Sequence, residues 1–82
     1  MTVREHIANK LMTLTKAGLT VFKTSDIQEL SYTGKNTFGR FLGSPGTYSR
    51  EFRRMRTDGM LKVKKLDRKN RQQIWVIQSI EY

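Results

Sequence analysis

The chain has 82 residues, 37% of them hydrophobic, and contains no cysteine. This length fits one domain over residues 1–82, and the lack of cysteine excludes disulfides, thiolate zinc sites and a cysteine nucleophile. Sixteen basic and seven acidic side chains give a formal net charge of +9, which predicts a polyanionic partner, with nucleic acid ahead of anionic lipid.

A first helix is expected at the start of the chain. Apolar residues recur at helical spacing from Val3 to Leu14. Thr2 and Glu5 have the spacing of a capping box, in which each satisfies a backbone N–H of the other. These signals predict a helix over about 3–17.

Two short elements are expected next. The run 19–22 is β-branched and aromatic and too brief for a helix, which predicts an edge strand. Thr24 or Ser25 then caps a second helix, since Ser25 and Gln28 have capping-box spacing. This helix is expected to end near Ser31.

The segment 32–46 contains four glycines and the only proline of the chain, which break regular structure. Phe38, Phe41 and Leu42 nevertheless have helical spacing. We therefore expect a short extra helix at 36–42, followed by a loop.

A longer helix is predicted over 47–58. Tyr48, Phe52 and Met55 recur at i, i+4 and i+7, and Gly59 provides a stop signal. At 100° per residue, the face opposite these apolar residues carries three arginines and a threonine, namely Arg50, Arg53, Arg54 and Thr57.

A β-hairpin is predicted at the end of the chain. The runs 60–66 and 74–80 are rich in β-branched or alternating apolar residues, and the polar segment 67–73 separates them. Trp75 lies within the second apolar run, so we expect it in the core rather than as a stacking platform for single strands.

The positive charge is concentrated in one part of the sequence. Residues 47–71 hold ten basic and three acidic side chains, a net +7, whereas residues 1–46 carry a net +3. Charge that serves only solubility is normally interspersed with the opposite sign. The distribution therefore indicates a basic binding surface on the predicted helix and hairpin.

The order helix, short strand, helix, helix, strand, basic loop, strand resembles the winged helix-turn-helix superfamily over roughly residues 3–78. The stretch 48–65 (YSREFRRMRTDGMLKVKK) resembles a recognition helix that turns at a glycine into the first wing strand, and 24–30 resembles the usual second helix. The resemblance implies an α+β winged helix-turn-helix fold with three main helices and a C-terminal β-hairpin wing. In that superfamily the third helix commonly enters the DNA major groove, and the wing contacts backbone or minor groove.

Two sets of residues are expected to contact DNA. Arginine forks onto the two acceptors of guanine, so the helix 47–58 is expected to read bases through Ser49, Arg50, Arg53, Arg54 and Thr57. The hairpin, with its tip at 67–73, is expected to contact the phosphate backbone through Lys62, Lys64, Lys65, Arg68, Lys69, Asn70 and Arg71.

A second register remains open, because 32–46 is longer than the usual turn between the second and third helices of the superfamily. In this register 26–42 is the helix-turn-helix, and the residues that approach bases are Lys35, Asn36, Thr37 and Arg40. We favour the first register because the arginine face and the direct run into the hairpin both belong to 47–65. Gly39 also weakens a short reading helix.

The expected function is sequence-preferring binding of double-stranded DNA, as a transcriptional regulator or a DNA-targeting module. The alternatives are a winged helix that binds structured RNA and a DNA-binding accessory factor in replication or recombination. An enzyme is not expected, because His6 is the only histidine and the seven acids do not cluster. Gly34 and Lys35 resemble the end of a phosphate-binding loop, but Glu29 stands where its first glycine is required. No cofactor, metal or small-molecule ligand is expected.

A homodimer on a palindromic site is a plausible assembly, with its contact on the first helix or at 80–82. No apolar run approaches the length of a membrane span. A cytoplasmic, nucleoid-associated location is therefore expected, without membrane contact.

Overall fold

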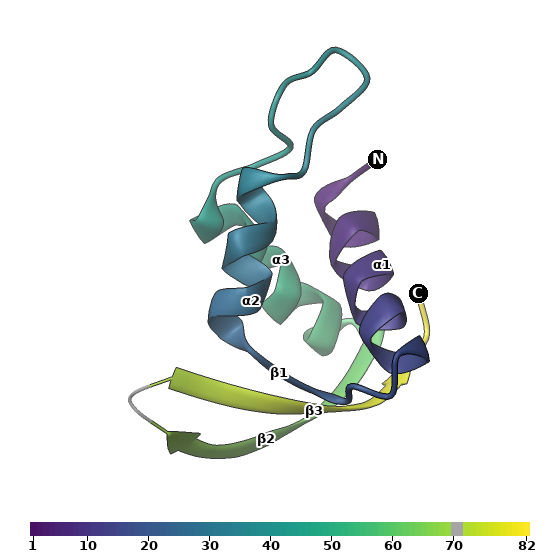
Figure 1. The fold of residues 1–82 in the computed structure, drawn as a ribbon, viewed down its shortest axis with the longest axis vertical. Coiled ribbons are helices and arrows are strands. Elements are labelled where there is room, and N and C mark those ends of the chain that lie inside the picture. Colours follow the sequence, from purple (N-terminus) through teal and green to yellow (C-terminus); the bar gives the residue numbers. More distant parts are fainter. Residues whose placement is uncertain (70–71) are drawn as a thin grey trace.

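Three helices pack against one face of a three-stranded antiparallel sheet (Figure 1). The structure, a computed structural model, describes the backbone of residues 1–69 and 72–82 and the side chains of 1–66 and 72–82. The elements in chain order are α1 (Val3–Lys16), β1 (Val21–Lys23), α2 (Thr24–Glu29), η1 (Leu30–Tyr32), α3 (Pro45–Thr57), β2 (Leu61–Lys69) and β3 (Gln72–Ile80). The predicted α+β class, with three main helices and a C-terminal hairpin, is confirmed.

Helix α1 begins where the capping signal predicts. The Thr2 hydroxyl accepts a hydrogen bond from the Glu5 N–H at 3.2 Å, which satisfies one of the free donors of the first turn. The apolar stripe of α1 lies in the core, where Ile7 and Leu11 are fully buried. That stripe is therefore not a free surface for a homodimer.

Helix α2 starts one residue earlier than the two proposed caps allow. The N-cap is Lys23, whose backbone N–H donates to the Asp26 carboxylate at 2.9 Å. A carboxylate at the third helical position reaches back to the N-cap backbone whatever side chain stands there. The predicted capping box of Ser25 and Gln28 is therefore wrong, and the helix ends in the 3-10 turn η1.

The predicted helix at 36–42 is wrong. Residues 33–43 instead form a projecting hairpin, with an antiparallel bridge between Lys35 and Phe41. The Asn36 side-chain oxygen accepts from the N–H groups of Phe38 at 2.9 Å and Arg40 at 3.1 Å. These bonds compete with helical ones, and a register that places a reading helix here is wrong as well.

Helix α3 begins at Pro45, two residues before the predicted start. The Ser44 hydroxyl caps it by accepting from the Thr47 N–H at 3.2 Å, and proline suits the first helical position because its missing N–H has no partner there. Gly59 has a φ of 79°, which ends the helix and directs the chain into β2.

The sheet has the order β1-β3-β2, so β3 is central. Strand β2 extends to Lys69 and β3 begins at Gln72, and these two residues pair with each other. The predicted loop over 67–73 is therefore too long, because a ladder of backbone hydrogen bonds does not require apolar side chains.

The core lies between the helices and the sheet. Phe52 of α3 packs edge-to-face against Phe22 and Trp75, with ring centroids 5.6 and 5.4 Å apart. Trp75 is only 7% exposed, which confirms its predicted core position. No helix within the described residues is long and apolar enough to cross a membrane.

Candidate nucleic-acid interface

The outward face of α3 is fixed by what the helix buries. Tyr48, Phe52 and Met55 are almost completely buried, which turns Arg50 and Arg53 toward solvent, as predicted. Neither arginine forms an ion pair with any side chain that the structure describes. Their guanidinium groups are therefore available to an external anion.

Arg54 differs from these two residues because it already has a carboxylate partner. Its guanidinium lies 3.2 Å from Glu51, which is bound at 2.7 Å by Arg4 of α1. The hydrogen bond from Arg4 lowers the pKa of Glu51, against the opposing effect of burial. Arg4 also reaches Asp58 at 3.1 Å. This network neutralises part of the Arg54 charge.

The two hydroxyls of the predicted set already form hydrogen bonds with other groups of the chain. Ser49 faces α2, where its Oγ accepts from the Gln28 side chain at 2.8 Å. The Thr57 hydroxyl is exposed and donates to the Arg53 carbonyl at 3.1 Å. Ser49 therefore links α3 to α2 through its hydrogen bond with Gln28.

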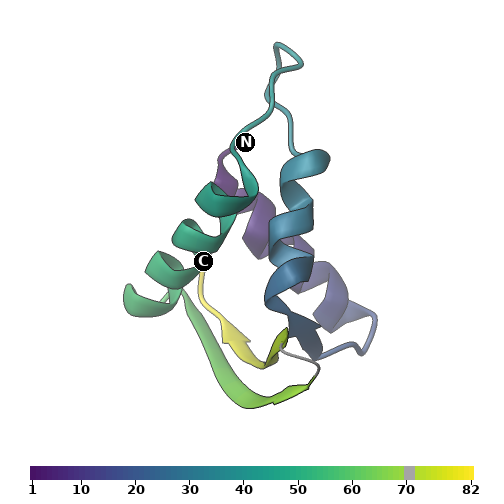
Figure 2. The same cartoon turned by 90° about the vertical axis from the view of Figure 1, so that its left-hand side faces the viewer.

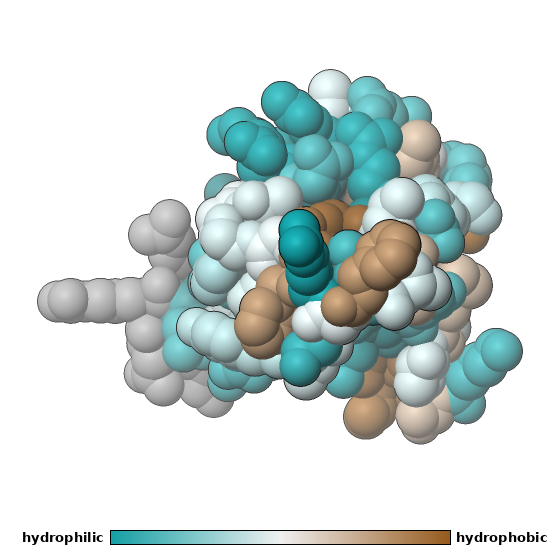
Figure 3. Space-filling model, turned by 90° about the horizontal axis from the view of Figure 1, so that it is seen from above, coloured by the Kyte–Doolittle hydropathy of each residue, from teal (hydrophilic) through white to brown (hydrophobic). Residues whose placement is uncertain are grey.

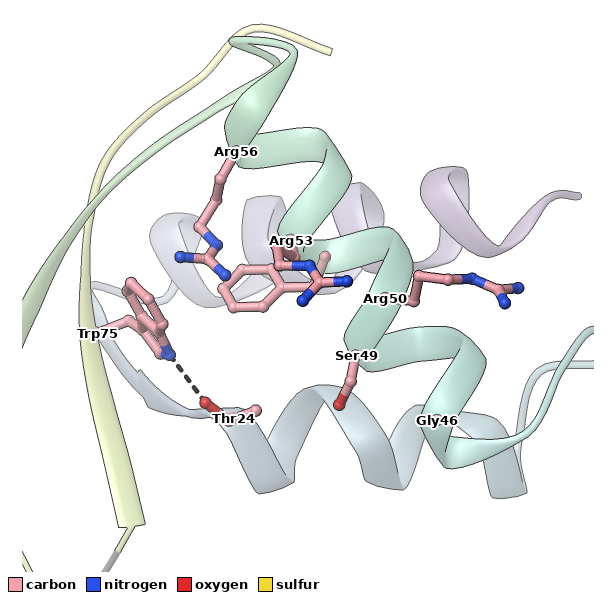
Figure 4. A pocket seen from close by; sticks show the side chains of 8 residues that line it. Thr24, Gly46, Ser49, Arg50, Arg53, Arg56 and Trp75 are labelled. Atoms are coloured by element: carbon pink, nitrogen blue, oxygen red, sulfur yellow. Dashed lines mark hydrogen bonds between the residues drawn. The ribbon is translucent and has the colours of Figure 1, made fainter.

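Arg56 belongs to this surface, although the sequence did not indicate it. Its guanidinium lies 4.3 Å from the Trp75 ring and 4.8 Å from the Phe52 ring (Figure 4). Burial, followed by the nearby charge of Arg53, lowers the pKa of Arg56. Its Nε is buried and has no hydrogen-bond partner among the described residues. Contact with the two rings limits the positions that the group and its remaining N–H donors can take.

An open hollow of about 350 Å³ lies beside α3, between α2 and β3. The buried rings of Phe52 and Trp75 form its floor, and the Trp75 Nε1–H donates to the Thr24 hydroxyl at 2.9 Å. The remaining lining residues are small or cationic: Gly46, Ser49, Arg50, Arg53 and Arg56. Figure 4 shows these side chains around the space. The hollow can receive a planar or anionic group.

The predicted wing lysines do not share one face. Directly opposed residues of neighbouring strands point to the same side of a sheet. Lys65 opposes Trp75 and so lies on the helix-covered side, whereas Lys64 opposes Val76 on the other side. Lys62 forms an ion pair with Glu81 at 3.2 Å. Lys65 therefore lies on the side of the sheet that faces the hollow, and Lys64 does not.

The remaining predicted wing contacts cannot be placed at this surface. Arg68 and Lys69 lie in β2, but their side chains are outside the described part of the chain. Asn70 and Arg71 lie outside the described residues altogether.

The residues of the second register gather in the 33–43 hairpin, away from the hollow. Lys35 Nζ lies 5.1 Å from the Phe41 ring, and Asn36 uses its side-chain oxygen on the backbone. Thr37 and Arg40 belong to the same turn. Figure 2 shows this hairpin at the opposite end of the molecule from the sheet.

His6 contacts the buried hydroxyl of Tyr48. Its Nδ1 lies 2.6 Å from the buried Tyr48 hydroxyl, at the base of the hairpin. Burial, together with the charge of Lys10, lowers the pKa of His6, and burial raises the pKa of Tyr48. The side chains that the structure describes contain no group of three or more acidic or histidine residues able to hold a metal.

Comparisons with protein-family models, curated proteins and solved structures found no significant match to this chain. The functional interpretation therefore depends on the residues and contacts described above.

Proposed function

We propose that this protein binds double-stranded DNA as a winged helix-turn-helix domain, with α3 in the major groove and the β2–β3 hairpin as its wing. The observation that carries the proposal is the outward face of α3, on which Arg50 and Arg53 have no ion-pair partner among the described side chains. Arg56 extends this face into the adjoining hollow.

The element order and the sheet order β1-β3-β2 are compatible with this mode of binding. A free arginine on an exposed helix can neutralise phosphate or fork onto guanine. Lys65 adds a cation on the same side of the sheet as Trp75. Sequence preference would come from the arginines on α3, and a role as regulator or targeting module would follow from that preference.

Titration of labelled duplex DNA tests the proposal. The logarithm of the binding constant should fall linearly with the logarithm of the salt concentration. Arg50→Ala with Arg53→Ala should weaken binding about tenfold or more and reduce the salt slope by up to about 2 units. A matched double variant, Lys10→Ala with Lys16→Ala on α1, removes the same charge away from the face.

Equal losses in the two double variants would contradict the assignment to α3, since only net charge would then matter. A selection from random duplexes measures sequence preference directly. An RNA duplex serves as competitor, because the A-form major groove does not admit a helix. Equal or tighter binding to that RNA would favour the structured-RNA alternative.

A further inference from the structure

The 33–43 hairpin and its base expose aromatic side chains that the α3 interface does not use. Phe38 at the tip is 86% exposed, Tyr32 at the base 69% and Phe41 60%. Tyr32 and Phe41 line one shallow hollow of about 370 Å³. Three exposed aromatic rings within one short segment of a small protein indicate a binding site.

The hairpin holds Phe38 outward through its own hydrogen bonds. The Asn36 N–H donates to the Arg40 carbonyl at 2.8 Å, and the Asn36 side chain accepts from the N–H groups of Phe38 and Arg40. The bridge between Lys35 and Phe41 closes the hairpin below this turn. The exposed ring is therefore presented by a defined turn.

The sequence around these aromatic residues carries only positively charged side chains. Residues 30–50 contain three basic side chains, Lys35, Arg40 and Arg50, and no acidic one. Lys35 Nζ also lies 5.1 Å from the Phe41 ring. Exposed rings beside cations suit a partner with flat faces and negative charge, which is the chemistry of unpaired bases and their phosphates.

The hairpin continues directly into the N-cap of α3. It occupies one end of the molecule's long axis and the sheet occupies the other, with α3 between them (Figures 1 and 2). Figure 3 looks down on the hairpin and shows hydrophobic side chains exposed beside hydrophilic ones. A nucleic acid that covers α3 and continues past Ser44 would reach Phe38.

We propose that the 33–43 hairpin binds unpaired bases next to the duplex held by α3. Phe38 stacks on a base, and Lys35 and Arg40 contact the neighbouring phosphates. This inference rests on the proposed function and extends it, because the protein then recognises a junction between duplex and single strand.

Binding to a blunt duplex and to the same duplex with a single-stranded overhang tests the inference. The overhang should strengthen binding about tenfold, as expected for stacking of one base. Phe38→Ala should abolish this preference and leave blunt-duplex binding unchanged. Phe38→Trp should retain the preference, whereas Phe38→Leu should lose it, because leucine is apolar but has no ring face. Leu19→Ala, at another apolar side chain that is 56% exposed, is the matched control.

The possible failures are distinguishable. Equal binding to both DNAs by the unmodified protein would overturn the hairpin inference and leave duplex binding by α3 in place. Binding to neither DNA would reject the proposed function itself. Self-association that Phe38→Ala abolishes, without any overhang preference, would assign the hairpin to a second copy of the chain and also overturn the inference.

Discussion

Replacing Arg56 separates a role in binding from a role in packing. The guanidinium contacts two aromatic rings, and a partly desolvated cation–π contact contributes about 1–2 kcal/mol. The buried Nε without a partner among the described residues opposes this by about 1–3 kcal/mol. The two effects oppose each other, so the net contribution of Arg56 to stability is expected to lie between a cost of about 2 kcal/mol and a gain of about 1 kcal/mol.

Arg56→Met tests this expectation, because methionine keeps an unbranched apolar stem over Trp75 and removes the charge. The free energy of unfolding should change by about 2 kcal/mol or less. It can be measured by urea titration with the fluorescence of Trp75, the only tryptophan. Affinity for duplex DNA should fall by about 1–3 kcal/mol, the value of one forked arginine contact.

Two further variants at this surface make the result specific. Arg56→Lys keeps the charge but lacks the planar guanidinium fork, so we expect an intermediate affinity. Arg54→Met removes the same charge from a side chain already paired with Glu51, and it should reduce affinity less. The assignment fails if Arg56→Met binds like the unmodified protein. A loss of stability of about 3 kcal/mol or more would instead make Arg56 a packing residue.

Three other changes test contacts around α3 and the hairpin base. Gly34→Ala should reduce the free energy of unfolding by about 1–3 kcal/mol, because a Cβ there would lie 2.6 Å from the His6 Nδ1 and contact the Tyr48 hydroxyl. Gly46→Ala is the control, since its Cβ would meet no atom closer than 3.8 Å. Equal losses in the two variants would contradict the steric explanation. Because the pKa of His6 is lowered in the folded chain, the unfolded chain binds the proton more readily, and stability should fall as pH decreases below about 6.5. Chemical denaturation between neutral and mildly acidic pH measures this fall. His6→Gln should remove the pH dependence in that range. Glu51→Gln should lower the melting temperature and strengthen duplex binding, because it frees Arg4 and removes a negative charge beside Arg54; weaker binding in a DNA titration would contradict this.

The sequence predicted those elements whose signals are local. The helices at Val3–Lys16 and Pro45–Thr57 follow apolar spacing and capping residues that lie within a few positions of each other. The outward direction of Arg50 and Arg53 follows from the same helical period. These predictions required no knowledge of what packs against the helix.

The hairpin at 33–43 shows where local spacing is ambiguous. Phe38 and Phe41 are three residues apart, which suits one face of a helix only if a core lies beside that face. Here both rings are exposed, and the Asn36 side chain bonds to the backbone of the turn. The Asn36 side chain competes with helical hydrogen bonds, and Gly39 adopts a φ of 77° that a helix does not allow. These two features favour the turn over the helix that the spacing predicts.

The role of each cation on α3 depends on residues that are distant in sequence. Arg54 pairs with Glu51, which also pairs with Arg4 near the N-terminus. Arg56 lies at the edge of the buried face on a helical wheel, and the position of Trp75 on β3 holds its guanidinium at the hollow beside α3. The charge of residues 47–71 therefore overstates the surface available for the proposed contact with DNA, because ion pairing, contact with aromatic rings and strand register place the described cations in different environments. On α3, the described cations that remain for the proposed contact are Arg50 and Arg53, with Arg56 held against the rings of Phe52 and Trp75.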